Sequence, residues 1–547
     1  MPIILRRHPA RAALVALALL GSIGIQAAPI ARHAGVAKAD SSTLIVDFIS
    51  DFSHLDPSLC YDTQCYPWMH ALYDQLIGYD TARGNGDTLV PDAATAMPVV
   101  TNGGKTYVFK LRNDVRFWDG KLATAADWVY SFERIINPAT KSGAQAFWLD
   151  IVGAQAYATG KAPHVSGIKA LGKFGLEVDL NSPYVGFLNV LAMPFGSVLE
   201  QAQVTKYGKS YDALHPMGTG PYLFTQHTLN QKLILTKNPH YFNPAHAGHI
   251  RTLQADIGVN AETSFLRLQK GQADLDGDFP TPIPPAEFLN VLNDPVLSKR
   301  VIRQVQVATQ FVSMNTRMKP FDNPLVRRAV NYAINKRLIL RLVNGRGQIT
   351  DNWLPPAMAG YGKSSPYPYN QAMAKKLLAQ AGYPNGLSTT FYSDNLSDDP
   401  RISQAIVAQL DAVGIHAALK VLDANTWQAL VMTPGKAPMT WTAWYQDFPD
   451  PNDFYEPILS CASAIPGTFN LAYYCNSKVD TLAHQLKVTV DQASRLNGYP
   501  QLDRMVMADA PLAPVFNSVY YILPSSALHN FYLHNVWTLV LADYAKS

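Results

Sequence analysis

The chain has 547 residues, of which 48% are hydrophobic and 16% are charged. This composition excludes an intrinsically disordered chain and is typical of a globular protein with the length for several domains. The formal net charge is +4, but five basic residues precede the first acidic residue, Asp40. Cleavage of the amino terminus after Ala27 removes three of these charges and leaves +1, and cleavage after Ala39 removes all five and leaves −1. Such a neutral chain is not expected to bind nucleic acid.

Residues 1–28 have the pattern of an export signal. A basic start with Arg6 and Arg7 precedes an apolar run over residues 12–25, which is too short to span a bilayer. Residues 19–22 resemble a bacterial lipoprotein box, but Ser22 stands where the lipidated cysteine would be. We therefore expect an exported, soluble periplasmic protein without a lipid anchor; a membrane anchor is the alternative.

The four cysteines form two close pairs in sequence, Cys60 with Cys65 and Cys461 with Cys475. An even number in an exported chain indicates disulfides. Three connectivities are possible, and we predict pairing within each close pair. Neither pair has the spacing of a zinc site, so no metal is expected there.

The first half of the chain mixes predicted strands and helices. Alternation predicts strands over residues 43–48, 106–111, 177–180, 222–226 and 232–236, and helical spacing predicts helices over 69–77, from 124 onward and over 261–269. Thr124 and Asp127 form a possible capping box. Residues 86–217 thus form a mixed α+β block, and the turn-rich segment 216–222 marks a crossover.

From Thr309 onward the pattern changes to alternating strands and helices. Strands are predicted over residues 311–314, 388–392, 416–422 and 439–445, with helices after Asn323 and over 371–381 and 401–413. Such alternation indicates an α/β domain with a mainly parallel sheet.

The segment from Met439 to Phe454 is the strongest candidate for a ligand site. Asp447 follows the predicted strand, at the edge where α/β sheets bind ligands. One carboxylate beside Trp441, Trp444 and Tyr445 suits a ligand with a positively charged amine. The alternative is a core strand that ends in an Asx turn.

Other candidate chemistry is weaker. Tyr61, Tyr66 and Trp68 surround the first cysteine pair, either as packing around a disulfide or as an aromatic wall of a ligand cleft. No metalloprotease or serine-hydrolase motif is present, and the glycines at 103–104 lack the start of a P-loop. His240, His246 and His249 are an alternative metal set in a predicted loop.

Five ordered blocks resemble the peptide-binding receptors of bacterial ABC importers, that is, extracellular solute-binding protein family 5 of the dipeptide and oligopeptide type. The matching residues are 107–132, Gly218–Tyr222, 315–334, the W-Y-Q-D-F-P-D-P-N-D-F run over 444–454, and 509–514. The resemblance implies a two-lobed α/β fold of the type II periplasmic-binding-protein class with an extra inserted α+β domain.

The same resemblance implies boundaries for these parts. Lobe I would combine residues 40–85, 218–308 and 510–547, the inserted domain would span 86–217, and lobe II would span 309–509. Two crossing segments near 308 and 509 would form a hinge, and the lobes would close on the ligand.

The resemblance also implies roles for individual residues. Asp447 would pair with the α-amino group of a peptide, Trp444 and Tyr445 would lie at neighbouring cleft positions, and the region of Cys60 and Tyr61 would pair with the ligand backbone. Cys461 and Cys475 fit a family disulfide. Two departures exist: Trp441 stands where some oligopeptide receptors have a basic residue, and the pair Cys60–Cys65 is outside the general pattern.

The predicted function is therefore that of a monomeric, non-catalytic receptor that captures short peptides and delivers them to an ABC permease in the inner membrane, without a cofactor. Because Trp441 departs from the pattern, a receptor for a nickel chelate, glutathione, haem or a sugar is the alternative with the same fold. A secreted peptidase and a periplasmic chaperone are alternatives from other classes.

Overall fold

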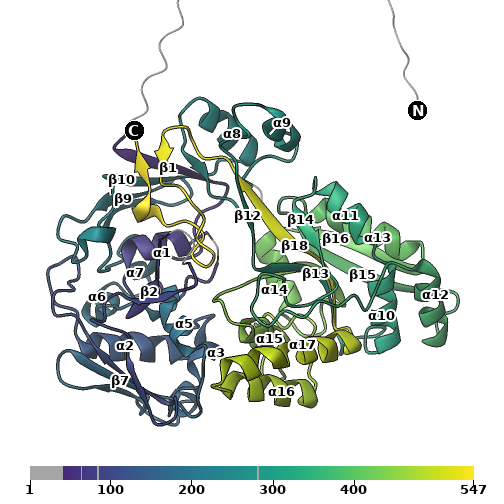
Figure 1. The fold of residues 1–547 in the computed structure, drawn as a ribbon, viewed down its shortest axis with the longest axis horizontal. Coiled ribbons are helices and arrows are strands. Elements are labelled where there is room, and N and C mark those ends of the chain that lie inside the picture. The colour runs from purple at the N-terminus through teal and green to yellow at the C-terminus, as the bar shows by residue number, and fades with distance from the viewer. Residues whose placement is uncertain (1–40, 63, 83–85, 280–281) are drawn as a thin grey trace, which may run out of the picture. The chain divides into compact units, whose positions relative to one another are not determined.

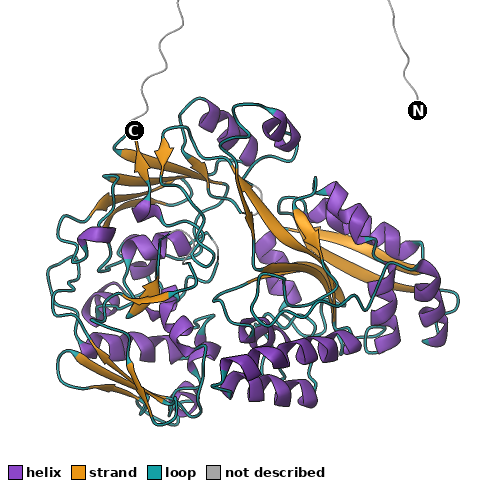
Figure 2. Ribbon diagram, in the orientation of Figure 1, coloured by secondary structure: helices purple, strands orange, loops and turns teal. Residues whose placement is uncertain are grey.

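The computed structural model describes residues 41–62, 64–82, 86–279 and 282–547 (Figure 1). The predicted export signal over residues 1–28 and both candidate cleavage positions lie outside these described residues. The described residues belong to one compact unit of mixed helices and strands (Figure 2). Within this part of the chain, no helix combines the length and the apolar character that a membrane span requires.

The first sheet has five strands in the order β11, β1, β10, β9, β8. Their bounds are β1 Thr43–Phe48, β8 Tyr222–Thr228, β9 Lys232–Lys237, β10 Thr252–Ile257 and β11 Leu275–Asp276. β1 pairs in parallel with β10 and β11, whereas β9 is antiparallel to both of its neighbours. The strand predicted over residues 43–48 is confirmed, as are the two strands after residue 221. The sheet thus joins the start of the described chain to segments more than 200 positions later, since Thr43 faces Thr252 and Val46 faces Leu275.

A second sheet lies within residues 86–217 and has the order β4, β5, β7, β6. Its strands are β4 Val99–Thr101, β5 Thr106–Lys110, β6 Ile168–Ala170 and β7 Gly175–Asp179. Helix α2 (Ala125–Ile136) packs with this sheet, and the predicted capping box is confirmed: the backbone N–H of Thr124 donates to Oδ2 of Asp127 over 2.8 Å. The buried residues of α2 and of this second sheet belong to the same hydrophobic core as those of the first sheet.

The largest sheet has the order β12, β18, β13, β17, β15, β16, with β14 beside β18. Its strands are β12 Ile302–Val305, β13 Ala308–Met314, β14 Gly347–Ile349, β15 Leu387–Asp394, β16 Ile415–Leu422, β17 Met439–Tyr445 and β18 Leu512–Ile522. Only the pairs β15–β16 and β15–β17 are parallel, and the other pairs are antiparallel. The prediction of a mainly parallel sheet is therefore wrong.

The connections explain this difference. β15, β16 and β17 follow one another through helices α13 (Asp399–Asp411) and α14 (Ala424–Val431), and helical crossovers give parallel strands. β13 and β18 enter the sheet from distant parts of the chain, so no such crossover fixes their direction. β18 pairs with β13 near its start, where Leu512 faces Ser313, and with β12 at its end, where Ile522 faces Ile302.

Both faces of the largest sheet are covered. On β17, Met439 and Trp441 belong to one core and Trp444 belongs to another. The predicted cap at Asn323 is confirmed, since its Oδ1 accepts a 2.9 Å hydrogen bond from the N–H of Leu325 at the start of α10. The other helices of this region are α10 Pro324–Ala333, α11 Lys336–Leu342, α12 Gln371–Gln380, α15 Asn452–Leu459, α16 Ser477–Val488 and α17 Gln492–Asp509.

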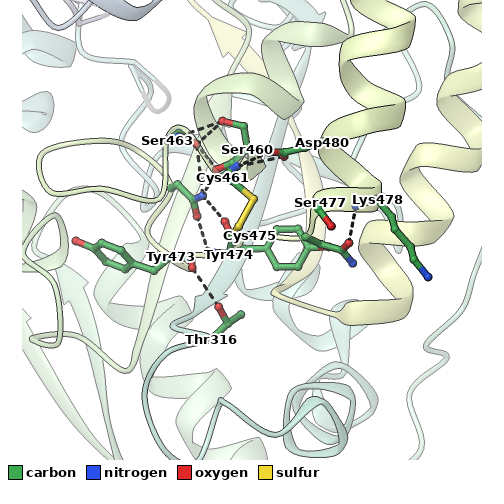
Figure 3. The surroundings of a disulfide bond; sticks show 12 residues. Thr316, Ser460, Cys461, Ser463, Tyr473, Tyr474, Cys475, Ser477, Lys478 and Asp480 are labelled. Carbon is green, nitrogen blue, oxygen red and sulfur yellow. Dashed lines mark hydrogen bonds between the residues drawn. A yellow bond between two sulfur atoms is a disulfide. The ribbon is translucent and has the colours of Figure 1, made fainter.

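Both predicted disulfides are present, Cys60–Cys65 and Cys461–Cys475. Figure 3 shows the second, which links the end of α15 to the segment before α16. The N–H of Cys461 also donates to both carboxylate oxygens of Asp480, over 3.1 and 3.0 Å. The disulfide and these hydrogen bonds fix the loop that follows the candidate site segment.

Candidate functional site

Strand β17 carries the candidate site residues to the interior of the largest sheet. It lies between β13 and β15, and its aromatic and β-branched residues suit a strand with neighbours on both edges. Pro449 and Pro451 follow the strand and prevent further pairing. Asp447 therefore lies in a short turn between β17 and α15, as its place after the predicted strand indicated.

This turn is fixed by Asp453, in the first turn of α15. Oδ2 of Asp453 accepts a 2.9 Å hydrogen bond from the backbone N–H of Asp447 and a 3.4 Å hydrogen bond from Nε1 of Trp444. The N–H of Gln446 donates to the carbonyl oxygen of Val307 over 3.0 Å. The backbone at Asp447 and at the preceding residue is thus held by a helix residue and by Val307, which lies in the link between β12 and β13.

The side chain of Asp447 meets a residue from the other end of the chain. The hydroxyl group of Tyr61 donates a 2.6 Å hydrogen bond to Oδ2 of Asp447. Tyr61 precedes helix α1 (Tyr66–Leu72), which begins and ends earlier than the helix predicted over 69–77, since Pro67 occupies its first turn and Ile77 already starts a strand. The structure therefore brings together two residues that were predicted to line one site.

Three phenylalanine rings surround Tyr61. The ring centroids of Phe195, Phe469 and Phe147 lie 5.2, 5.7 and 6.4 Å from that of Tyr61, each in an edge-to-face arrangement. Phe469 also packs against Trp444 at 5.5 Å. These rings exclude water from one side of the carboxyl group and lower the local dielectric constant.

Burial has a strong effect on the acids of the site. It raises the pKa of Asp447 to about 7, although hydrogen bonds from Tyr61 and Asp453 lower it. Burial, followed by repulsion from Asp447, raises the pKa of Asp453 well above its usual value. Burial also raises the pKa of Tyr61, so the tyrosine is a neutral hydrogen-bond donor.

No cation of the described residues neutralises this pair of acids. Tyr61, Tyr66 and the two aspartates shift one another's pKa values. No described lysine, arginine or histidine is among the groups that shift the pKa of either aspartate. Asp447 is half-buried and Asp453 is fully buried, and an acidic pair with this little exposure and no cationic partner among the described residues is a good position for a positively charged ligand group.

The other predicted residues differ in their surroundings. Trp444 lies beside Asp453 and Phe469, next to Asp447. Tyr445 points to a separate cluster, where its hydroxyl accepts a 2.9 Å hydrogen bond from Nε2 of Gln310 and its ring lies 6.2 Å from that of Tyr520.

The structure does not bring the side chains of Trp441 and Cys60 to Asp447. Trp441 is only 1% exposed, packs against Phe516 in a separate hydrophobic core, and donates from Nε1 to Oδ1 of Asp399 over 2.8 Å. Trp441 and Trp444 are three positions apart on β17, and successive residues of a strand face opposite sides of the sheet. The two side chains therefore lie on different faces. The sulfur of Cys60 is bonded to Cys65 and the residue is fully buried.

Sequence reasoning missed Asp453 and the phenylalanines around Tyr61. Asp453 had a signal, because it follows Asp447 by six positions and comes two residues after Pro451, and proline is common where a helix begins. Phe147, Phe195 and Phe469 had none, since only the fold brings them together. Among the described residues, no three histidine, cysteine or acidic side chains are placed to hold a metal ion, and His246 instead lies 3.6 Å from Asp543.

Comparison with known proteins adds independent information. Residues 88–465 match the model of the family described as "Bacterial extracellular solute-binding proteins, family 5 Middle". The chain is 29% identical over 499 residues to the glutathione-binding protein GsiB of Pectobacterium atrosepticum, covering 90% of this chain and 91% of that protein.

Solved structures have the same fold. The periplasmic binding protein DppA of Helicobacter pylori, in complex with the peptide STSA, is similar with a TM-score of 0.81 and 25% identity over 92% of this chain and 98% of that one. The murein tripeptide binding protein MppA of Escherichia coli matches with a TM-score of 0.80 and 22% identity over 93% and 99% of the two chains.

Proposed function

The chain belongs to family 5 of the bacterial extracellular solute-binding proteins, and on this premise we propose that it captures short peptides by their amino-terminal ammonium group. One observation carries the proposal. Asp447 is a carboxyl group with an aromatic wall and no cationic partner in the part of the chain that the structure describes, and it lies where a sheet strand ends. A peptide ammonium would supply the missing charge through a charge-assisted hydrogen bond.

The aromatic surroundings fit the first residue of a peptide. Trp444 and Phe469 form an apolar wall beside Asp447, and Phe195 packs edge-to-face against Tyr61. Such rings accept aliphatic or aromatic side chains, whereas the carboxyl group selects the amine. In this proposal backbone hydrogen bonds hold the rest of the peptide, with the segment around Cys60 and Tyr61 as one partner.

The proposed lobes follow the sequence expectation. Lobe I comprises residues 40–85, 218–308 and 510–547, the inserted domain comprises 86–217, and lobe II comprises 309–509. The hydrophobic cores support a passage between the lobes along β18, because Ala513 and Val515 pack in the core of the largest sheet, whereas Tyr520 and Ile522 pack in the core that contains the first sheet. Tyr61 then belongs to lobe I and Asp447 to lobe II, so the ligand site lies between them, with the hinge near residues 308 and 509.

We place the receptor in the periplasm, as a soluble monomer that presents its ligand to the permease of an ABC importer. It has no catalytic role in this proposal. The expected export signal and the extracellular solute-binding family support this location.

Glutathione is the second candidate ligand, because a relative with 29% identity is named as a glutathione-binding protein. Glutathione is itself a short peptide with a free α-ammonium group, so the same carboxyl group would bind it. Competition between glutathione and trialanine for the purified protein distinguishes a dedicated glutathione receptor from a general peptide receptor.

Native mass spectrometry of protein purified without denaturation tests the proposal. The expected result is a set of co-purified peptides in the wild type that is lost in Asp447→Ala. Turnover of a peptide library by the pure protein would instead indicate a peptidase. Binding of unfolded proteins without defined small ligands would indicate a chaperone.

A further inference from the structure

Asp453 is a second carboxyl group in the candidate site, and its two oxygens have different environments. Oδ2 accepts hydrogen bonds from the backbone of Asp447 and from Trp444. Oδ1 is buried and accepts no hydrogen bond from any described residue. An ionised carboxylate with a buried oxygen that lacks a donor is costly, whereas a protonated one becomes a donor itself.

A partner for that proton is close. Oδ2 of Asp453 lies 2.9 Å from the backbone nitrogen of Asp447, so the two carboxyl groups are neighbours, and each affects the pKa of the other. Two ionised carboxylates in contact repel each other, so such a pair keeps at least one proton. The groups that face the pair are Tyr61 and Tyr66, which are neutral donors and bring no positive charge.

Resting on the proposed function, we propose that Asp453 stays protonated as a hydrogen-bond donor to Asp447, and that the ligand's ammonium group displaces a proton from Asp447. Below a pH of about 7, both carboxyl groups of the empty site carry a proton. On binding, Asp447 releases its proton to solvent and pairs with the ammonium group, which keeps its three protons. The net charge of the buried site is zero before and after, which is the least costly state in a low dielectric.

The direction of the resulting pH dependence follows. Burial raises the pKa of Asp447 to about 7, against hydrogen bonds from Tyr61 and Asp453 that lower it. The ammonium binds the ionised form, so affinity decreases as the pH falls below about 7 and the ligand must compete with protons. A peptide amine keeps its own charge up to a pH of about 8. Binding is therefore strongest near neutral pH and weakens in acid.

Isothermal titration calorimetry with trialanine tests this coupling. Titrations at pH 5.5, 6.5 and 7.5, each in two buffers with different ionisation enthalpies, measure both affinity and proton release. We expect release approaching one proton per trialanine at pH 5.5 and an affinity loss of up to about tenfold per pH unit below 7. Proton release should decrease towards zero as the pH rises above 7.

Two variants separate the role of Asp453 from simple structural support. Asp453→Ala removes the donor to Asp447 and should weaken trialanine binding at pH 7.5 by about tenfold. Asp453→Asn should restore most of this affinity, because an amide accepts from Asp447 and Trp444 through its oxygen and donates to Asp447 through its nitrogen. Asp411→Asn, the same change at an exposed position of the same region, serves as the control for surface charge.

The outcomes are distinct. A pH-independent affinity without proton release, in a wild type that binds trialanine, would overturn the coupling and leave the peptide-binding proposal intact. An Asn variant as weak as the Ala variant would show that Asp453 acts through a negative charge and would also overturn it. A wild type that binds neither trialanine nor glutathione at any pH would overturn both proposals.

Discussion

The hydroxyl group of Tyr61 donates to the carboxylate of Asp447 over 2.6 Å, although the two residues lie 386 positions apart in the chain. Tyr61 lies in the loop before α1, and Asp447 lies in the turn after β17 of the largest sheet. Among the described residues, no positively charged side chain neutralises this contact. A peptide amine would bring the missing positive charge. The predictions below depend on this arrangement.

Replacing Asp447 with alanine should weaken trialanine binding by at least about 30-fold. The physical reason is that the ammonium group would be desolvated without its counter-charge, which costs about 2–5 kcal/mol. Calorimetry at pH 7.5 measures the effect. The ligand-free variant should not unfold at a lower temperature, because the substitution removes a buried acidic group that lacks a cation.

Asp411→Ala is the matched control for this prediction, since Asp411 carries the same side chain on the surface, where it is 62% exposed. Its affinity for trialanine should equal that of the wild type. If Asp447→Ala also retained wild-type affinity, Asp447 would not contact the ligand.

Lys487 connects residues 86–217 to the region that contains the site. Its Nζ lies 2.5 Å from Oδ2 of Asp150 and 2.7 Å from Oε1 of Glu456, and it lies over the ring of Tyr184. Lys487→Met should leave the two acids facing each other and lower the free energy of unfolding by about 1–3 kcal/mol. This loss lies between the free-energy costs of breaking a buried and an exposed ion pair, because the side chain of Glu456 is 38% exposed to water.

Urea unfolding measures this loss, and Lys478→Met provides the control because Lys478 is an exposed residue of the same helix, α16. Equal stability of the two variants would show that the bridge contributes nothing to the fold.

The two disulfides should differ in their contributions to stability. The chain-entropy model gives about 3 kcal/mol for Cys461–Cys475, whose partners are 14 positions apart, and about 2 kcal/mol for Cys60–Cys65, which are 5 apart. Double substitution of each pair by alanine, followed by urea unfolding, tests this order. A larger loss from the shorter loop would show that burial of Cys60 and Cys65 outweighs the loop entropy.

His534 should make the protein less stable in acid. Its Nδ1 accepts hydrogen bonds from the backbone N–H groups of Val536 and Trp537, both over 3.1 Å, so protonation at Nδ1 would break them. Burial lowers the pKa of His534 to about 4. Its contribution is complete above the unfolded pKa of about 6.5 and decreases as the pH falls toward 4, because the unfolded chain binds the proton more readily.

His534→Asn keeps an acceptor near the Nδ1 position but does not titrate. Thermal unfolding between pH 7 and 4 should therefore show a smaller loss of stability in this variant than in the wild type. Parallel pH profiles for the two proteins would contradict the assignment.

The sequence predicted the parts of the site that depend on local pattern. The strand over 439–445, the acid after it and the capping box at Thr124 all follow from neighbouring residues, and the structure contains each of them. The directions of β13 and β18 depend on distant connections, so local alternation gave the wrong sheet. Similarly, the rings that pack against Tyr61 come from three separate segments, with Phe147, Phe195 and Phe469. No local sequence pattern predicts these contacts.

The most direct test of the central claim compares trialanine with N-acetyltrialanine on the wild-type protein by calorimetry at pH 7.5. Acetylation removes the positive charge and leaves the rest of the peptide in place. If Asp447 holds the amino terminus, the acetylated peptide should bind at least about 30-fold more weakly, and Asp447→Ala should bind both peptides with similar, low affinity. Equal binding of the two peptides to the wild type would contradict the claim.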